Sequence, residues 1–346
     1  YPPLFLMLFA PFAALPLQVS AALWVILKVI VLAALGRALI RRLRLEHQPA
    51  AWLVAACIAG PYVIEEFRYG NAQFFVFALT ATALLIITAR PILAAMLLAL
   101  AVSLKVWPLF FLPYLFVRGQ RKAVAWVLLG VLVLTLLPAG FLGFGENLRL
   151  LGEWGRQEFF TQLGAEELWL PNQSLRGILM RYLTRLDYTK VSDTKYPLVH
   201  VVETDPEVVR FLWLGLAGLA YAGLLALAAC RKGSCDEVDH GIAFCALGLL
   251  APITLKFALV MLIWPAMIAG MLAVRESTPA WIRRWICALC ALALLQPLIP
   301  GAAAQRLAHA LGMDFVITVL LVLPLVFLRR PAATSSSPPV QASTVC

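Results

Sequence analysis

The residues best suited to chemistry form a short polar segment between two apolar runs. Glu65, Glu66 and Arg68 are followed by Asn71 and Gln73, which places two carboxylates, a guanidinium and two amides within nine residues. A carboxylate can accept a proton from an attacking hydroxyl, a guanidinium can bind phosphate, and amides can hydrogen-bond a polyhydroxylated ligand. A solvated loop is the simpler interpretation. However, Asn71 and Gln73 begin an apolar run, where water is scarce, so we favour a binding site.

Other candidate ligands lie elsewhere in the chain. Lys105 and Lys256 are isolated cations in apolar surroundings; each either extends toward lipid headgroups or binds an anion. Asn172 and Gln173 form a second amide pair, with Arg176 close by, inside a long polar segment. We expect this pair to contact a polyhydroxylated ligand as well.

Metal and nucleotide motifs are missing from the sequence. It contains no GxxxxGK[ST] and no HExxH motif, and its four histidines are widely separated. The seven cysteines are scattered, mostly inside apolar runs, without paired zinc-like spacing. We expect neither a metal nor a cofactor.

The composition indicates which elements must position these residues. Of 346 residues, 62% are hydrophobic and 13% are charged, whereas a soluble domain has about 25% charged residues. The net charge of +10 lies in short breaks between apolar runs rather than on one solvated face, which argues against nucleic-acid binding. The chain is therefore predicted to be an all-α, polytopic membrane protein.

Eleven apolar runs are predicted to be transmembrane helices. They cover residues 15–39, 50–64, 72–88, 91–104, 107–117, 123–142, 208–229, 240–254, 257–274, 285–300 and 313–328. The runs 91–104 and 107–117 are short for spans and could instead form a re-entrant hairpin. The stretch Leu4–Ala14 is too short to span and is expected at the membrane interface.

The distribution of Lys and Arg sets the orientation. Fifteen of them flank one set of helix ends, and the opposite short loops hold four, namely Arg68, Lys105, Lys256 and Arg306. The richer set marks the cytoplasmic side. Because Lys105 and Lys256 then lie on the depleted outer side, topology does not explain them, and we interpret them, with Arg68, as anion ligands.

Residues 143–207 form a long insertion on the outer side. It holds ten of the chain's eighteen carboxylates, and polar connections of this length usually carry function. We expect helical patches such as Leu148–Leu163 to lie along the membrane surface. Residues 1–330 are predicted to form a single domain, and the Ser- and Pro-rich tail 331–346 is predicted to be disordered and cytoplasmic.

Lys28 lies near the middle of the run 15–39. A charge at that depth costs at least about 2.5 kcal/mol and usually faces the interior of a helix bundle. The sequence alone does not identify its partner.

Several of these segments, in this order, resemble the integral-membrane glycosyltransferases of family 87, such as the polyprenyl-phosphate-mannose-dependent mannosyltransferases. The matching stretches are Tyr1–Leu4, Leu15–Pro16, Leu23–Trp24, Gly70–Gln73, Ser103–Pro108, Tyr114, Arg118–Lys122, Asn172–Leu175 and Ala251–Thr254. The resemblance implies a GT-C fold of about a dozen spans, a lipid-linked rather than nucleotide-linked sugar, and chemistry on the non-cytoplasmic side.

The resemblance also has two departures. The family's presumed base is an aspartate on an outer loop preceding the tyrosine-proline pair, and this chain begins at Tyr1 rather than Met. We therefore expect the base upstream, with Glu65 and Glu66 as the candidates in this chain. At Thr254–Phe257, relatives often have a tryptophan and one or two histidines. Either Lys256 takes over a donor-binding role there, or the activity is altered.

The resemblance and the residues together predict inverting transfer of a hexose, expected to be mannose, from a polyprenyl-phosphate sugar to a lipid or glycan acceptor. Arg68, Lys105 and Lys256 would bind the donor phosphate. The sugar or acceptor would be bound by Asn71, Gln73, Asn172, Gln173 and Arg176. The expected location is the plasma (inner) membrane, with membrane lipids as partners and the site facing outward. A transporter or flippase is the alternative, favoured only by Lys28, and a non-catalytic scaffold for lipid-linked intermediates is a third possibility.

Overall fold

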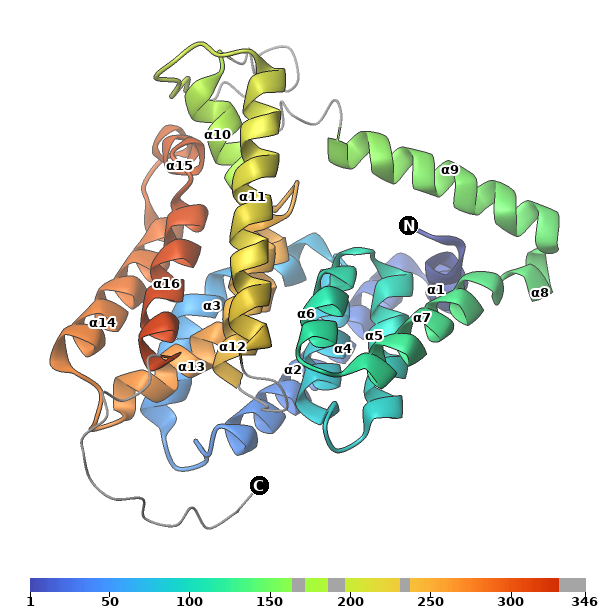
Figure 1. Ribbon diagram of the computed structural model, residues 1–346, viewed down its shortest axis with the longest axis horizontal. Coiled ribbons are helices and arrows are strands. Elements are labelled where there is room, and N and C mark those ends of the chain that lie inside the picture. The colour runs from blue at the N-terminus through green and yellow to red at the C-terminus, as the bar shows by residue number, and fades with distance from the viewer. Residues whose placement is uncertain (164–171, 186–196, 231–236, 330–346) are drawn as a thin grey trace.

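The computed structural model describes residues 1–163, 172–185, 197–230 and 237–329. Within these ranges the regular elements are all helical, as the sequence predicted (Figure 1). The predicted tail, 331–346, lies outside the described residues, as do residues 164–171 and 186–196 of the insertion.

The first half of the chain forms nine α-helices and one 3-10 helix. They are α1 (Pro3–Ala13), α2 (Leu17–Arg42), α3 (Pro49–Tyr69), α4 (Gln73–Ile86), α5 (Pro91–Leu104), η1 (Trp107–Phe110), α6 (Phe111–Val117), α7 (Arg121–Leu136), α8 (Ala139–Leu142) and α9 (Phe144–Leu163). The remaining described elements are α10 (Leu175–Leu183), α11 (Pro206–Ala229), α12 (Glu237–Leu250), η4 (Lys256–Leu262), α13 (Ile263–Val274), α14 (Ala280–Leu295), η5 (Gln296–Leu298), α15 (Ala302–Ala310) and α16 (Met313–Arg329).

The predicted count of about eleven spans is not supported. Six helical stretches of the described chain are long and apolar enough to cross a membrane, namely 17–42, 49–69, 121–142, 206–229, 256–274 and 280–298. A seventh is possible if α15 and α16, bent by 52°, form one span. A span needs about 20 helical residues, and α4, α5 and α12 have 14 each. The prediction failed because it treated each apolar run as a span without knowing where its helix ends.

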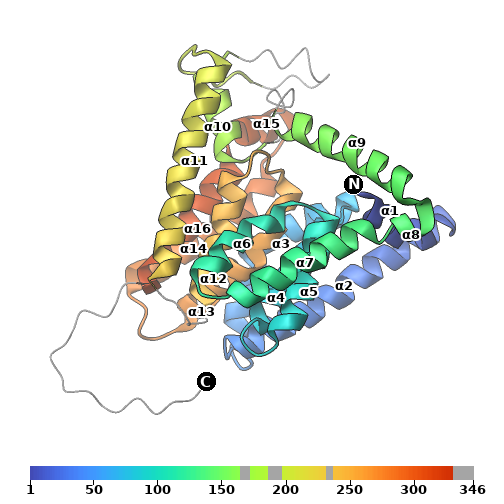
Figure 2. The same cartoon turned by 45° about the vertical axis from the view of Figure 1, so that its right-hand side comes forward.

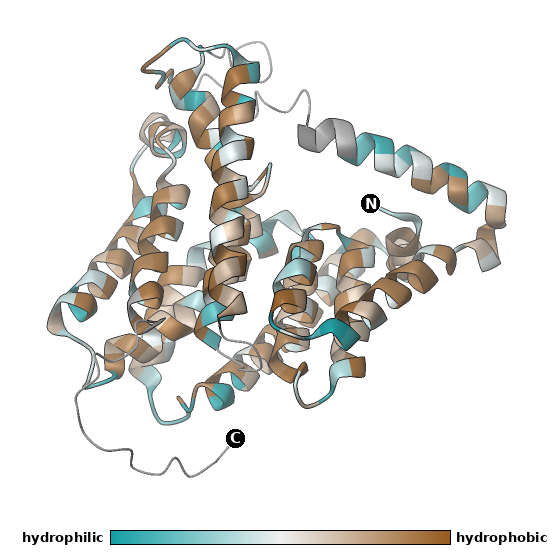
Figure 3. Cartoon of the chain, in the orientation of Figure 1, coloured by the Kyte–Doolittle hydropathy of each residue, from teal (hydrophilic) through white to brown (hydrophobic). Residues whose placement is uncertain are grey.

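The core forms around α13, which packs against α3, α12, α14 and α16. Gly270 of α13 lies so close to α3 that a Cβ there would collide with the carbonyl oxygen of Ala51. Small residues allow such close approach between helices in membranes. A second group, α4, α5 and α7, packs beside this core. Figure 3 shows hydrophobic residues along the helices of the bundle and hydrophilic ones on α9 and at helix ends.

Two helices lie apart from the central packing. Helix α1 has 11 residues and is too short to span, as expected for Leu4–Ala14. Helix α9 is a 20-residue helix that includes the predicted patch Leu148–Leu163, and it packs on α1 and α8 at one end of the molecule (Figure 2). Its position on the membrane surface stays a prediction.

Candidate functional site

The polar segment at residues 65–73 is largely helical rather than a loop. The run predicted to end near Ile64 continues as α3 to Tyr69, and Gly70 ends it with a left-handed backbone, φ 64°. Glycine is the residue that adopts this conformation without steric cost. Glu65 and Glu66 therefore lie on the last turns of a helix, where neighbouring side chains point in different directions.

Glu66 forms a fully buried ion pair with Lys28. The Lys28 ammonium lies 2.6 Å from Oε2 of Glu66, and both side chains have no exposed surface. Lys28 also donates to the Glu66 carbonyl oxygen at 3.2 Å. The other carboxylate oxygen, Oε1, accepts from the backbone N–H of Phe74 at 3.0 Å, in the first turn of α4. Both oxygens of Glu66 are thus engaged, and the partner that the sequence did not reveal for Lys28 is Glu66.

The helix arrangement explains how Lys28 reaches Glu66. The indole N–H of Trp24 donates to the carbonyl oxygen of Gly70 at 2.9 Å, so α2 extends past the end of α3. Lys28 is one helical turn further along, about 6 Å at 1.5 Å per residue, level with Glu66. Its ammonium also lies 5.6 Å from the ring centroid of Trp24 and 5.2 Å from that of Phe67. Aromatic faces of this kind stabilise a desolvated cation.

A group of polar residues near this pair is called the Tyr1 cluster here. It consists of Tyr1, Asn71, Lys105 and Glu158. The Tyr1 hydroxyl donates to Oδ1 of Asn71 at 3.1 Å, and the Lys105 ammonium lies 6.0 Å from the Tyr1 ring centroid. Burial lowers the pKa of Lys105, whereas the carboxylates of Glu158 and Glu66 raise it. The same two carboxylates and burial raise the pKa of Tyr1. Helix α9, through Glu158, therefore adds a charge to this cluster.

Lys256 belongs to a second group, the Asp314 cluster, defined as Lys256, Gln296, His309 and Asp314. The Lys256 ammonium donates to Oε1 of Gln296 at 3.3 Å, and Nε2 of Gln296 donates to Oδ1 of Asp314 at 2.8 Å. Nε2 of His309 lies 3.6 Å from Oδ2 of Asp314. Asp314 has no exposed surface, while Lys256 and His309 are half-buried. A chain of polar groups thus connects two partly accessible bases through a buried carboxylate.

The end of α3 lies between the two clusters. Glu66 faces the Tyr1 cluster, whereas Glu65 is half-buried and is an electrostatic neighbour of His309. The rings of Tyr69 and Phe257 lie 5.6 Å apart, which connects this end of α3 to the start of η4 beside Lys256. The candidate site is therefore built on the last turn of α3, with one cluster on each side.

The predicted amide pair, Asn172 and Gln173, hydrogen-bonds to the backbone near the Asp314 cluster. Asn172 donates through Nδ2 to the carbonyl oxygen of Pro252 at 2.9 Å, and its Oδ1 accepts from the backbone of Ser174 at 3.0 Å and Thr254 at 2.9 Å. Gln173 donates through Nε2 to the carbonyl oxygen of His309 at 3.1 Å. Both side chains are buried. In this structure they hold the backbone that carries Lys256 and His309 rather than facing outward.

The other predicted ligands have different surroundings. Gln73 is buried in the first turn of α4, and its backbone N–H donates to Oδ1 of Asn71 at 3.2 Å. Arg176 is buried on α10, and its guanidinium carbon lies 5.4 Å from the ring centroid of Trp213 on α11. Arg68 is exposed in the last turn of α3. Of the three predicted phosphate ligands, Lys105 and Lys256 are thus the ones within the two clusters.

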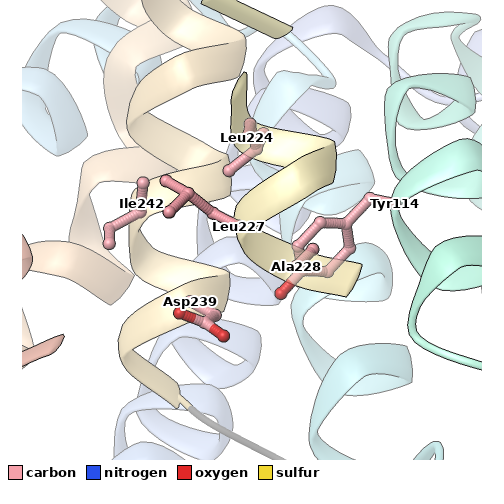
Figure 4. A pocket seen from close by; sticks show the side chains of 6 residues that line it. All are labelled: Tyr114, Leu224, Leu227, Ala228, Asp239 and Ile242. Carbon is pink, nitrogen blue, oxygen red and sulfur yellow. The ribbon is translucent and has the colours of Figure 1, made fainter. Parts of the chain in front are cut away.

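A small cavity of about 10 Å³ lies elsewhere, between α6, α11 and α12, which is room for about one water molecule. It is lined by Tyr114, Leu224, Leu227, Ala228, Asp239 and Ile242 (Figure 4). Sites for small molecules usually measure about 300–1,000 Å³. The Asp239 carboxylate is already paired with Arg118 at 2.8 Å. Asp239 lies in the first turn of α12, whereas Thr254 and Lys256 follow the opposite end of that helix, so this cavity does not belong to the candidate site.

Three residues of the Asp314 cluster were not among the predicted ligands: Gln296, His309 and Asp314. A signal for Asp314 existed, because it is a carboxylate inside the apolar run 313–328, and ionisable residues in such runs tend to be functional. His309 and Gln296 carried no comparable signal. Within the described ranges, no group of three His, Cys, Asp or Glu side chains could hold a metal ion.

Comparison with known proteins gives one match. The sequence profile of glycosyltransferase family 87 matches residues 1–255, about three quarters of the chain. No curated protein and no solved structure matches it.

Proposed function

The chain belongs to glycosyltransferase family 87, and from this premise we propose that it transfers a hexose from a polyprenyl-phosphate donor to a lipid or glycan acceptor. Membership supports a membrane glycosyltransferase with a sugar donor and an acceptor. The lipid-linked donor, mannose as the sugar, the GT-C architecture and the inverting course are parts of the proposal. So are the plasma membrane and the outward-facing site.

One observation carries the choice of donor: two lysines from distant parts of the chain lie on either side of the last turn of α3. Lys105 sits in the Tyr1 cluster and Lys256 in the Asp314 cluster. A polyprenyl-phosphate sugar keeps its tail in the bilayer and its phosphate at headgroup level. An enzyme that uses it needs cations at that depth, where a charge-assisted hydrogen bond to phosphate is stronger than a neutral one. Lys105 and Lys256 meet this need, with Arg68 more exposed beside them.

Those cations would act on the leaving group. As the bond between the anomeric carbon and the phosphate oxygen breaks, negative charge builds up on the phosphate, and fixed cations stabilise it. A carboxylate would take the proton of the attacking hydroxyl. Of the two candidates in this chain, Glu65 suits this role better, because both oxygens of Glu66 are already engaged.

The transporter alternative rested on Lys28 as a lone intramembrane charge. Lys28 is paired with Glu66, and its side chain has no exposed surface. Its charge is therefore not accessible to a molecule that moves along a transport path. Transport is therefore considered only as an alternative result of the experiment described next.

The test is a donor assay with the purified full-length protein in liposomes. We expect sugar transfer from a polyprenyl-phosphate sugar and none from GDP- or UDP-sugars. Lys105→Ala and Lys256→Ala should each raise the KM for the lipid donor, while Lys122→Ala, an exposed cation at the start of α7, should not. Efficient use of a nucleotide sugar would overturn the donor class. Movement of the intact lipid donor across the membrane without transfer would favour a flippase.

A further inference from the structure

The Asp314 cluster contains a histidine to which the proposed function assigns no role. His309 lies near the end of α15, and Asp314 lies in the first turn of α16. Between them Gly312 turns the chain with φ 78°, and a Cβ there would collide with the side chain of Ile178 on α10. The tight turn between α15 and α16 packs against α10 and therefore places the His309 and Asp314 side chains next to each other.

The carboxylate of Asp314 is arranged to hold an imidazole. Its Oδ1 accepts from Gln296, while its Oδ2 is buried and faces Nε2 of His309 at 3.6 Å; the Tyr62 hydroxyl is a further donor beside this carboxylate. A buried carboxylate opposite one ring nitrogen fixes the proton on that nitrogen and stabilises the imidazolium. The other nitrogen, Nδ1, is then the one left to a ligand.

The groups around His309 come from five elements. Helix α3 contributes Glu65 and also Tyr62, which is a neighbour of Asp314. Lys256 comes from η4, Gln296 from η5, Arg181 from α10 and Asp314 from α16. Burial is the largest influence and opposes the charged imidazolium, as do the charges of Lys256 and Arg181, whereas Asp314 and Glu65 favour it. The Asp314 carboxylate is therefore the group that most favours the protonated form, which an acid in catalysis requires.

We propose that His309 is a further catalytic residue, the general acid that protonates the departing phosphate, and that Asp314 positions it. The proposal rests on the proposed function. The bond between the anomeric carbon and the phosphate oxygen breaks, and its electron pair stays on that oxygen, which takes the proton from Nδ1 of His309. The acceptor oxygen forms the new bond to the anomeric carbon and gives its proton to the base. The products are the glycosylated acceptor and a protonated polyprenyl phosphate.

Lys256 supports this assignment because it belongs to the same network. Its ammonium and the His309 imidazole are joined through Gln296 and Asp314, and Lys256 is among the charges that act on His309. The family profile ends at residue 255. His309 and Asp314 therefore lie beyond the matched residues, and the family match assigns them no role.

The test measures transfer from a polyprenyl-phosphate sugar between about pH 5 and pH 8, where histidine titrates. The rate of the unaltered protein should fall as pH rises, because an acid must carry its proton. His309→Asn should lower kcat by about 10²-fold or more, change the donor KM little, and abolish that fall. Asp314→Asn should move the fall to lower pH, since the imidazolium loses its stabilising carboxylate.

His200 provides a matched control, because its Nε2 lies 3.7 Å from Oε1 of Glu203, outside the cluster. His200→Asn should leave kcat and the pH profile unchanged. Unchanged kcat and pH profile in His309→Asn would overturn the assignment. If that variant does not fold, a rate of the unaltered protein that does not fall with rising pH would overturn it equally. Absence of any transfer by the unaltered protein contradicts the proposed function instead.

Discussion

At the scale of single residues, two adjacent carboxylates have different surroundings. Glu66 is committed to Lys28 and to the first turn of α4, whereas Glu65 is half-buried near His309. The helical geometry of α3 is the cause, because consecutive side chains of a helix point about 100° apart. Glu66 thus stabilises the packing of α2, α3 and α4, and Glu65 is the carboxylate that remains for the proposed chemistry.

The Lys28–Glu66 pair yields a prediction on stability. Removing one partner leaves an uncompensated buried charge, which costs about 3–5 kcal/mol. Lys28→Met and Glu66→Gln should each lower the thermal unfolding temperature of the detergent-solubilised protein markedly. The double variant should lose clearly less than the sum of the two, because no charge remains buried. Strictly additive losses would show that the two side chains do not interact.

At this scale, the sequence indicated which single residues were unusual, but it did not indicate which side chains contact each other. Lys105 and Lys256 were recognisable as isolated cations that the predicted topology does not explain. The partner of Lys28 was not, because Lys28 and Glu66 are 38 positions apart and meet only once α2 and α3 are packed. Likewise, Asn172 was expected to contact a ligand. Its three hydrogen bonds to the backbone of residues 252–254 and 174 became visible only when α10 was placed.

At the scale of elements, α3 and α13 approach each other closely at Gly270. A Cβ there meets backbone rather than a flexible side chain, so the helices themselves must move apart. Gly270→Ala should destabilise the protein by about 1–3 kcal/mol, the usual cost of overpacking. The measurement is thermal unfolding in detergent, compared with Gly218→Ala on α11, where a Cβ meets no atom within 4 Å. Equal unfolding temperatures for the two variants would contradict this account of the packing.

Element types were predictable here and element lengths were not. High apolar content with short charged breaks was enough to predict an all-helical membrane protein, and the runs 15–39 and 208–229 match α2 and α11. Hydropathy does not show where a helix ends. Helix α3 continues through Glu65 and Glu66 and ends only at Gly70. The apolar runs of α4 and α5 were predicted as spans, although each helix is about 21 Å long at 1.5 Å per residue.

At the scale of the whole molecule, the account requires one orientation in the membrane. The bias of fifteen basic residues to four predicts that the loop before α7 is inside and the segment before α11 is outside. In a cysteine-free background, Val201→Cys, which is 76% exposed, should react with an impermeant maleimide in intact cells. Gln120→Cys should react only after the membrane is opened. The opposite labelling would invert the topology and place the site on the cytoplasmic side.

The central claim is that a polyprenyl phosphate binds at the end of α3, between the Tyr1 cluster and the Asp314 cluster. Photo-crosslinking tests it most directly, with a polyprenyl phosphate that carries a photoreactive group next to its phosphate and with peptides mapped by mass spectrometry. The account predicts labelled peptides that include Lys105, Lys256 or the last turn of α3, and weaker labelling in Lys256→Ala. Labelling concentrated instead around Arg118 and Asp239, at the other end of the bundle, would contradict it.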